Sequence, residues 1–224
     1  MKKFLLALAF IPVFAFAQNH EANLRKIYDA ELSSGHTYEN LRYLCKVVGN
    51  RLAGSPGAAA AVEWTKQLME SYDFDTVYLQ PVMVPHWERG GKDMVKIVNS
   101  EKHGTVELNA LALGNTHGTG AKGLVGEVVE VKSIPELQSL GEKVKGKIVF
   151  FNGPMDPKLI DTFQAYAGAN AQRSSGAAEA SKLGAIGTLV RSLSSTVNDI
   201  PHTGNQRYNP DFPKIPALAI STKD

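Results

Sequence analysis

The stretch Ala177-Ala-Glu-Ala-Ser-Lys-Leu-Gly-Ala-Ile-Gly-Thr-Leu-Val190 contains both halves of an α/β unit. Ala177–Leu183 is typical of a short helix that ends at Gly184. Ile186–Val190 follows at once and favours a buried strand. Three further apolar runs predict neighbouring strands, at Leu124–Val131, Ile148–Phe151 and Ala217–Ile220. Because helical patterns separate these runs, the sequence predicts the α/β class, with a mixed β/α layered domain in this half.

Two helix starts in this half have recognisable sequence signals. Ser133-Ile-Pro-Glu136 forms a capping box, in which a serine begins the helix and a glutamate follows three residues later. Asp156-Pro157 predicts the start of another helix, which we expect to continue through Tyr166 and to end at Gly168.

The amino-terminal half is predicted to contain three helices and two short edge strands. The first helix ends at Gly35, the second runs from Thr37 to Gly49, and the third begins at Ser55-Pro56. Apolar residues at helical spacing predict the inward stripe of the third helix: Ala61, Trp64, Leu68 and Tyr72. The strands are predicted at Thr76–Val84, which Pro81 interrupts, and at Met94–Val98.

The composition changes after about residue 101, where glycine becomes frequent and aromatic residues become rare. We therefore expect two regions, residues 18–110 and residues 111–224. The single cysteine, Cys45, excludes an intrachain disulfide, and its apolar neighbours predict a buried thiol.

The first 17 residues have the three parts of a secretory signal peptide in the right order. Lys2 and Lys3 precede the apolar run Phe4–Phe14, and Ala15-Phe-Ala17 is a small-x-small cleavage pattern. We expect cleavage between Ala17 and Gln18, export to the periplasm or the medium, and no stable membrane anchor afterwards. An uncleaved anchor or a buried helix is the alternative.

The charge balance excludes nucleic acid as an obvious partner. The chain has 24 Lys and Arg against 22 Asp and Glu, and cleavage of the signal removes two lysines and no acid. The mature net charge is therefore zero, so no basic excess is left to attract a polyanion.

Common catalytic motifs are absent from the sequence. Gly118-Thr-Gly-Ala-Lys-Gly123 fits a dinucleotide fingerprint, but a strand pattern follows it where that fingerprint needs a helix, so a glycine-rich hairpin is favoured. The six histidines show no metal-ligand spacing such as H-E-x-x-H, and no G-x-S-x-G elbow supports a serine hydrolase. His202-Thr-Gly-Asn-Gln-Arg-Tyr208 reads as a polar surface loop or as a loop that reaches over a binding cleft.

Several segments together carry a resemblance to known enzymes. The segment Asn50-Arg-Leu-Ala-Gly-Ser-Pro-Gly57 resembles the opening of zinc-dependent exopeptidases of the carboxypeptidase Q and di-zinc aminopeptidase type. Lys143-Val-Lys-Gly-Lys-Ile-Val-Phe150, the stretch 177–190 and Ile215–Ile220 resemble a protease-associated domain. The segments Arg191–Ser194 and Pro201–Tyr208 strengthen the resemblance, which covers nearly the whole chain after the signal.

The resemblance implies that residues 18–110 open a peptidase domain and that residues 111–224 form a protease-associated domain. It also implies an enzyme with two zinc ions, bridged by a water or hydroxide, and a glutamate as general base. In such enzymes these residues follow the protease-associated insert, so this chain is expected to contain neither metal ligands nor catalytic residues, and to bind no zinc by itself. His202, Arg207 and Tyr208 are the candidates for the substrate cleft: Tyr208 could stack and Arg207 could meet a peptide carboxylate.

The main hypothesis is therefore an inactive amino-terminal part of a secreted di-zinc exopeptidase that acts on short peptides. Ser221-Thr-Lys-Asp224, which has the pattern of a helix start, agrees with truncation. The alternative is a complete, non-catalytic protease-associated module that binds peptides or a partner protein. Assembly into a homodimer and the end from which the parent removes residues are left open.

Overall fold

A computed structural model describes residues 20–224 of the chain. The predicted signal peptide and its cleavage site between Ala17 and Gln18 lie outside the described residues. The chain divides into two compact units between Val84 and Pro85. The segment 85–110, which the sequence grouped with the amino-terminal region, is therefore part of the second unit. No helix among the described residues is long and apolar enough to cross a membrane.

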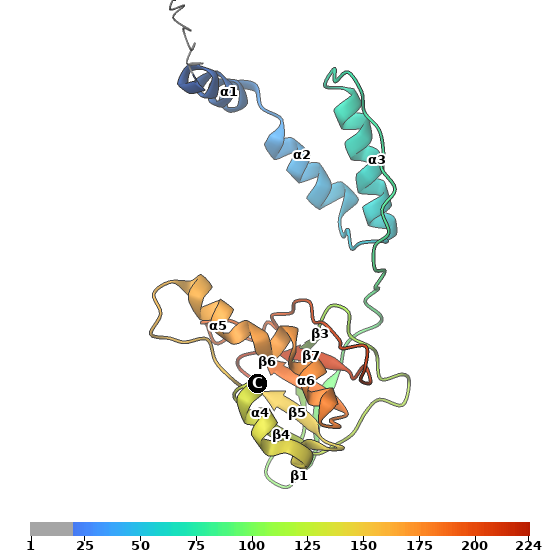
Figure 1. Ribbon diagram of the computed structural model, residues 1–224, viewed down its shortest axis with the longest axis vertical. Coiled ribbons are helices and arrows are strands. Elements are labelled where there is room, and N and C mark those ends of the chain that lie inside the picture. The colour runs from blue at the N-terminus through green and yellow to red at the C-terminus, as the bar shows by residue number, and fades with distance from the viewer. Residues whose placement is uncertain (1–19) are drawn as a thin grey trace, which may run out of the picture. The chain divides into compact units, whose positions relative to one another are not determined.

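The first unit consists of three helices followed by an extended segment (Figure 1). These helices are α1 (His20–Ser34), α2 (Thr37–Tyr43), which continues as the π-helical turn η1 (Leu44–Val48), and α3 (Pro56–Glu70). As predicted, Ser55 begins α3: its hydroxyl accepts a hydrogen bond from the Ala58 N–H at 3.2 Å, and a proline occupies the first turn.

These three helices have no buried core. No residue of α1, α2, η1 or α3 is buried, and Leu32 is 83% exposed. One stacked pair, Tyr43 and Trp64 with ring centroids 4.8 Å apart, links the second helix to the third. The predicted burial of Cys45 is wrong: the thiol is exposed, because none of the residues from 20 to 224 covers the side of the helix that carries it.

The strand predicted at Thr76–Val84 is also wrong. The segment is extended, but none of its residues pairs with a neighbouring strand. Val82 is 77% exposed and Met83 is 97% exposed. A β-branched segment becomes a strand only when a partner supplies its hydrogen bonds, and Pro81 has no N–H to donate.

The second unit is built around a five-stranded mixed sheet, which confirms the predicted α/β class (Figure 1). Its strands are β3 (Ala110–Ala112), β4 (Val128–Val131), β5 (Ile148–Phe151), β6 (Gly187–Arg191) and β7 (Ala217–Ile220). The order across the sheet is β3-β7-β6-β5-β4. The four strands from β4 to β7 are parallel, and β3 joins antiparallel to β7 at the edge.

A separate antiparallel hairpin precedes the sheet. It consists of β1 (Val95–Ser100) and β2 (Gly104–Leu108), and its register shifts between Ile97 and Ser100. The sequence predicted the first of these strands. It predicted neither β2 nor the short edge strand β3.

Three helices connect the parallel strands: α4 (Ile134–Leu140), α5 (Thr162–Ser174) and α6 (Gly176–Lys182). A 3-10 turn, η2 (Gly141–Val144), follows α4. The predicted serine cap of α4 is confirmed, since the Ser133 hydroxyl accepts from the Glu136 N–H at 3.2 Å. The Glu136 carboxylate reaches the Lys132 N–H at 2.7 Å.

The predicted start of α5 at Asp156-Pro157 is wrong. Asp161 caps this helix, and its Oδ1 accepts from the N–H groups of Phe163 and Gln164 at 2.9 and 3.4 Å. The Asp156 Oδ1 instead accepts from the Lys158 N–H at 2.9 Å within its own turn. Gly168, the expected end, lies inside the helix, which continues to Ser174.

The core of the second unit lies between the sheet and the helices α4 and α6. Val131, Val149 and Phe151 point from the strands into this layer and are 0% exposed. Leu137 of α4 and Ala180 of α6 meet them from the helical side, also 0% exposed. Close approach of α6 depends on Gly176, where a Cβ atom would lie 2.7 Å from the Phe151 ring.

We predict that Gly176→Ala destabilises the second unit by about 1–3 kcal/mol, because the added methyl group must displace a buried ring. Urea unfolding followed by circular dichroism measures the change. Gly168→Ala is the matched control: this glycine lies inside α5 with nothing within 4 Å of the added carbon. That variant should be about 0.5–1 kcal/mol more stable, since alanine is the better helix former. Equal stability of wild type and the Gly176→Ala variant would contradict the packing described.

Candidate functional site

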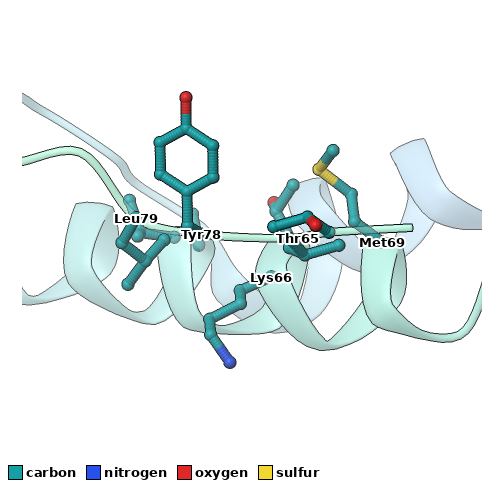
Figure 2. A pocket seen from close by; sticks show the side chains of 9 residues that line it. Thr65, Lys66, Met69, Tyr78 and Leu79 are labelled. Atoms are coloured by element: carbon teal, nitrogen blue, oxygen red, sulfur yellow. The ribbon is translucent and has the colours of Figure 1, made fainter. Parts of the chain in front are cut away.

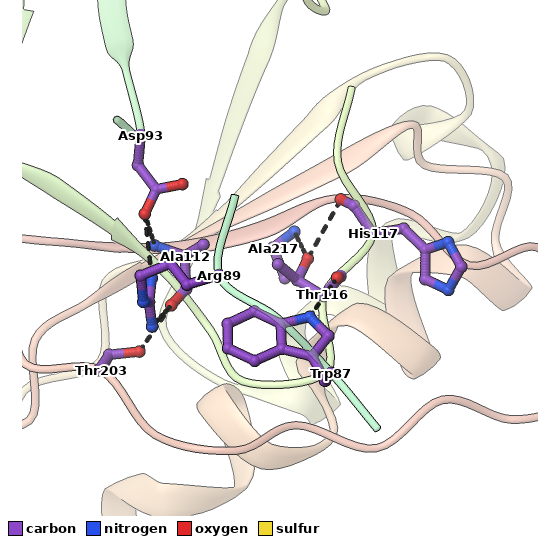
Figure 3. Close-up of polar contacts among 8 residues, drawn as sticks. All are labelled: Trp87, Arg89, Asp93, Ala112, Thr116, His117, Thr203 and Ala217. Atoms are coloured by element: carbon purple, nitrogen blue, oxygen red, sulfur yellow. Dashed lines mark hydrogen bonds and ion pairs between the residues drawn. The ribbon is translucent and has the colours of Figure 1, made fainter. Parts of the chain in front are cut away.

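The segment that begins the second unit is fastened by side chains to the edge of the sheet (Figure 3). The Asp93 Oδ2 accepts from the Ala112 N–H at 2.8 Å and pairs with Arg89 at 3.0 Å. Arg89 and Thr203 both donate to the Ala112 carbonyl, at 3.1 and 2.8 Å. The side chains thus satisfy the outward peptide groups of the edge strand, which would otherwise lack a partner.

Thr116 joins this segment to the sheet. Its carbonyl accepts from the Trp87 indole N–H at 3.0 Å, and its hydroxyl accepts from the Ala217 N–H at 2.8 Å, as drawn in Figure 3. Both bonds use a donor that is distant in sequence. The indole of Trp87 is therefore held beside the start of β7.

Tyr208 approaches the same place from the loop before β7. Its hydroxyl donates to the Ile215 carbonyl and accepts from the His117 N–H at 3.3 Å. The rings of His117 and Tyr208 meet edge to face with centroids 5.8 Å apart. The ring of Tyr208 is half-buried against the core. The tyrosine therefore anchors the loop before β7 and leaves part of its ring exposed.

A pocket of about 430 Å³ lies in the second unit where these segments meet. Trp87, Tyr208 and Pro210 give it apolar surface, and Asn115 and Gln206 contribute amides. Its remaining lining residues are basic or imidazole side chains: His86, His117, Arg207 and Lys214. The pocket has no acidic lining residue, so its electrostatic character is positive.

The structure brings two of the three sequence-predicted site residues together. Arg207 and Tyr208 both line the pocket, whereas His202 does not. The His202 Nδ1 lies 2.7 Å from the Leu193 carbonyl, and its backbone N–H donates to the Ser192 hydroxyl at 2.7 Å. His202 therefore ties its loop to the end of β6.

Sequence reasoning missed most of the pocket. Trp87 and His117 come from segments about 90–120 residues before the predicted loop. No local pattern links residues at such a separation, because the topology of the sheet determines which loops meet. The Thr116 contacts are the structural signal that identifies them.

A buried arginine supports the loop 202–208, which carries Arg207 and Tyr208. Arg173 is 6% exposed and donates to Tyr166, to the Asn170 Oδ1 at 3.0 Å and to the Thr203 carbonyl at 3.4 Å. All of these acceptors are neutral, and the Arg173 Nε has no partner among residues 20–224. Gly204 allows the loop to pass close to this guanidinium, since a Cβ atom would lie 2.6 Å from the guanidinium carbon and would displace it.

The first unit has its own surface pocket of about 390 Å³, between α3 and the segment 76–79 (Figure 2). Its walls include Met69 and Leu79, and in Figure 2 the Tyr78 ring and the Lys66 ammonium group point away from each other. The Lys66 Nζ pairs with the Glu70 Oε1 at 2.5 Å, and this hydrogen bond raises the pKa of Lys66 above its ordinary value. Lys66 is thus held as a cation on the surface of α3.

The described residues do not assemble the ligands of a zinc site. Within residues 20–224 no group of three or more His, Cys, Asp or Glu side chains is placed to hold a metal ion. His86 and Glu88 lie 3.0 Å apart as a pair. A protein zinc site needs at least three converging ligands, so this pair does not fit one.

Comparison with known proteins shows homology to a peptidase. The chain is 38% identical over 192 residues to carboxypeptidase Q of Xenopus laevis and 35% identical over 192 residues to that of Homo sapiens. Each alignment covers 86% of this chain and 38% of the relative. The chain therefore spans well under half the length of these relatives. No protein-family model matches the chain.

Solved structures share the fold. A peptidase M28 precursor from Shewanella amazonensis superposes with a TM-score of 0.79 at 30% identity, over 90% of this chain and 45% of that one. A zinc aminopeptidase from Bacillus subtilis superposes with a TM-score of 0.52 at 17% identity, over 83% of this chain and 38% of that one. The second likeness concerns the fold alone.

Replacement of Tyr208 by phenylalanine tests the anchoring role of its hydroxyl. We predict that Tyr208→Phe lowers the free energy of unfolding by about 1–3 kcal/mol, because the buried Ile215 carbonyl loses its donor. Tyr78→Phe is the matched control. Tyr78 is 77% exposed, so we expect a change within about 0.5 kcal/mol. If urea unfolding gives the same stability for both variants, the hydroxyl of Tyr208 does not anchor the loop.

Proposed function

We propose that this homologue of carboxypeptidase Q is part of a secreted zinc exopeptidase that hydrolyses short peptides. The homology over 86% of the chain carries the proposal. The fold agrees with it, since the chain superposes closely on a peptidase M28 precursor. Export rests on the sequence pattern of residues 1–17, in which a basic start, an apolar run and a small-x-small site follow one another.

We further propose that the metal ligands and the general base belong to a part of the parent protein outside residues 20–224. The relatives extend far beyond the stretch that aligns with this chain, which leaves room for a catalytic part. The histidine singled out in the loop before β7 is engaged elsewhere, because its Nδ1 contacts the Leu193 carbonyl. For the parent we propose two zinc ions.

The two units of the chain fit different roles in such a parent. The helices α1 to α3 carry large apolar side chains without a core of their own, among them Ile27 (65% exposed) and Leu41 (55% exposed). Helices with apolar stripes are stable when another layer covers them, so we assign them to the opening of the peptidase domain. The second unit has its own core, and we assign residues 111–224 to a protease-associated domain.

Metal analysis and peptide hydrolysis by the natively exported protein test this function. We expect bound zinc and dipeptide hydrolysis that a chelator abolishes and added zinc restores. The 224-residue chain alone is the control, and we expect it to hydrolyse no dipeptide and to bind no stoichiometric zinc. Chelator-sensitive hydrolysis by the chain alone, or a native protein without any such activity, would count against the proposal.

A further inference from the structure

The pocket of the second unit carries positive charge that the described residues leave unbalanced. Arg207 and Lys214 are both exposed lining residues, and within residues 20–224 neither forms an ion pair. Two acidic residues are next to lining residues in the sequence. Glu88, which follows Trp87, contacts His86 at 3.0 Å, and Asp211, which follows Pro210, is exposed and forms no ion pair with Arg207 or Lys214. An arginine and a lysine at one concave surface without a carboxylate favour a ligand that carries a negative charge.

The same pocket has an apolar wall. Trp87 is half-buried, and its indole N–H is bonded to the Thr116 carbonyl, which limits the positions open to the ring. Tyr208 is held in the same way through its hydroxyl. Two aromatic side chains fixed by their polar ends offer a rigid surface to an apolar group at little entropic cost.

A third feature is a lining amide that has no hydrogen-bond partner among residues 20–224. Gln206 lines the pocket and is 0% exposed, and neither its Oε1 nor its Nε2 has a hydrogen-bond partner among residues 20–224. Its backbone is fixed, since its N–H donates to the Gly114 carbonyl at 3.1 Å. A buried amide offers one acceptor and two donor hydrogens, and leaving both atoms unpaired is costly. Because Gln206 is 0% exposed, contact between its amide and a ligand requires a shift of other lining side chains, and among these Asn115 and Arg207 are exposed.

A peptide with a free carboxyl end has all three complementary groups: a carboxylate, a peptide N–H and C=O, and a side chain. We propose that the pocket binds the carboxyl end of a short peptide. Arg207 and Lys214 hold the carboxylate, Trp87 and Tyr208 contact the last side chain, and Gln206 meets the peptide group. This inference rests on the proposed function, which supplies short peptides as the ligand class.

The indole signal of Trp87 in a ¹H–¹⁵N NMR spectrum of the chain reports on the pocket directly. The chain has two tryptophans, so Trp87→Phe assigns the two indole signals. We expect N-acetyl-Ala-Phe with a free carboxylate to shift the Trp87 signal saturably and to leave the Trp64 signal unchanged. The same peptide with a carboxamide end should bind at least about tenfold more weakly, because it lacks the charge-assisted hydrogen bonds.

Charge variants identify the residues that hold the carboxylate. Arg207→Gln and Lys214→Gln should each weaken binding of the free acid by about tenfold or more, with the carboxamide peptide unaffected. Lys158→Gln is the matched control, since Lys158 is exposed in the same unit, forms no ion pair among residues 20–224 and does not line the pocket. Unfolding curves of all variants should superpose, because both lining side chains are exposed.

Three results with the peptides, and one with inorganic phosphate, would overturn the assignment. The three peptide results are equal affinity for the acid and the carboxamide, unchanged affinity in both pocket variants, and no shift of the Trp87 signal with either peptide. Inorganic phosphate that binds as tightly as the free acid at the same signal would show a general anion site instead. The assay needs neither zinc nor hydrolysis. If the native protein shows zinc-dependent hydrolysis but neither peptide binds to the pocket, the pocket assignment is wrong and the proposed function still stands.

Discussion

The second unit depends on the layer of helices packed against Phe151, because a parallel sheet is stable only when its apolar faces are covered. Phe151 lies in β5, between β6 and the edge strand β4, and α6 comes close enough to cover it because residue 176 is a glycine. With this layer in place, β6 and β7 continue the parallel order. The edge strand β3, which precedes β4 in the chain, pairs antiparallel with β7, so the segment around Thr116 that follows β3 lies at the start of β7.

The candidate pocket depends on this pairing of β3 with β7. Thr116 bonds to Trp87 from one direction and to Ala217 from the other, and Tyr208 bonds to Ile215 just before β7. Segments from three parts of the chain therefore meet at one end of the sheet, where loops are free to carry functional side chains on a rigid support. The helices of the first unit lack such a support, since none of their residues is buried. We therefore propose that the second unit binds the ligand and that the helices of the first unit have a structural role in the parent protein.

The sequence predicted features that depend on short-range chemistry. The serine caps at Ser55 and Ser133 and the strand Ala217–Ile220 were predicted correctly, because a cap or an apolar run needs no distant partner to be recognised. The predicted start of α5 is wrong, since both aspartates accept a backbone N–H two residues later, but Asp156 does so in an isolated turn and Asp161 at the helix start. The resemblance to zinc exopeptidases was confirmed by homology to carboxypeptidase Q.

Features that depend on distant partners escaped prediction. The segment Thr76–Val84 has the composition of a strand but forms no ladder in the described chain. The pocket required knowledge of the sheet order, so Arg207 and Tyr208 were singled out without Trp87, and His202 was included although it faces the Leu193 carbonyl. Strand order is set by packing of the whole unit and leaves no trace in any single segment.

We propose that this chain is one part of a longer zinc exopeptidase, and the intact mass of the natively exported protein, obtained by mass spectrometry, decides whether it is. We expect a mass well above the 24.2 kDa of these 224 residues, in a single polypeptide that contains their sequence. A native mass at or just below 24.2 kDa would contradict it, and would favour a complete binding module without catalytic residues.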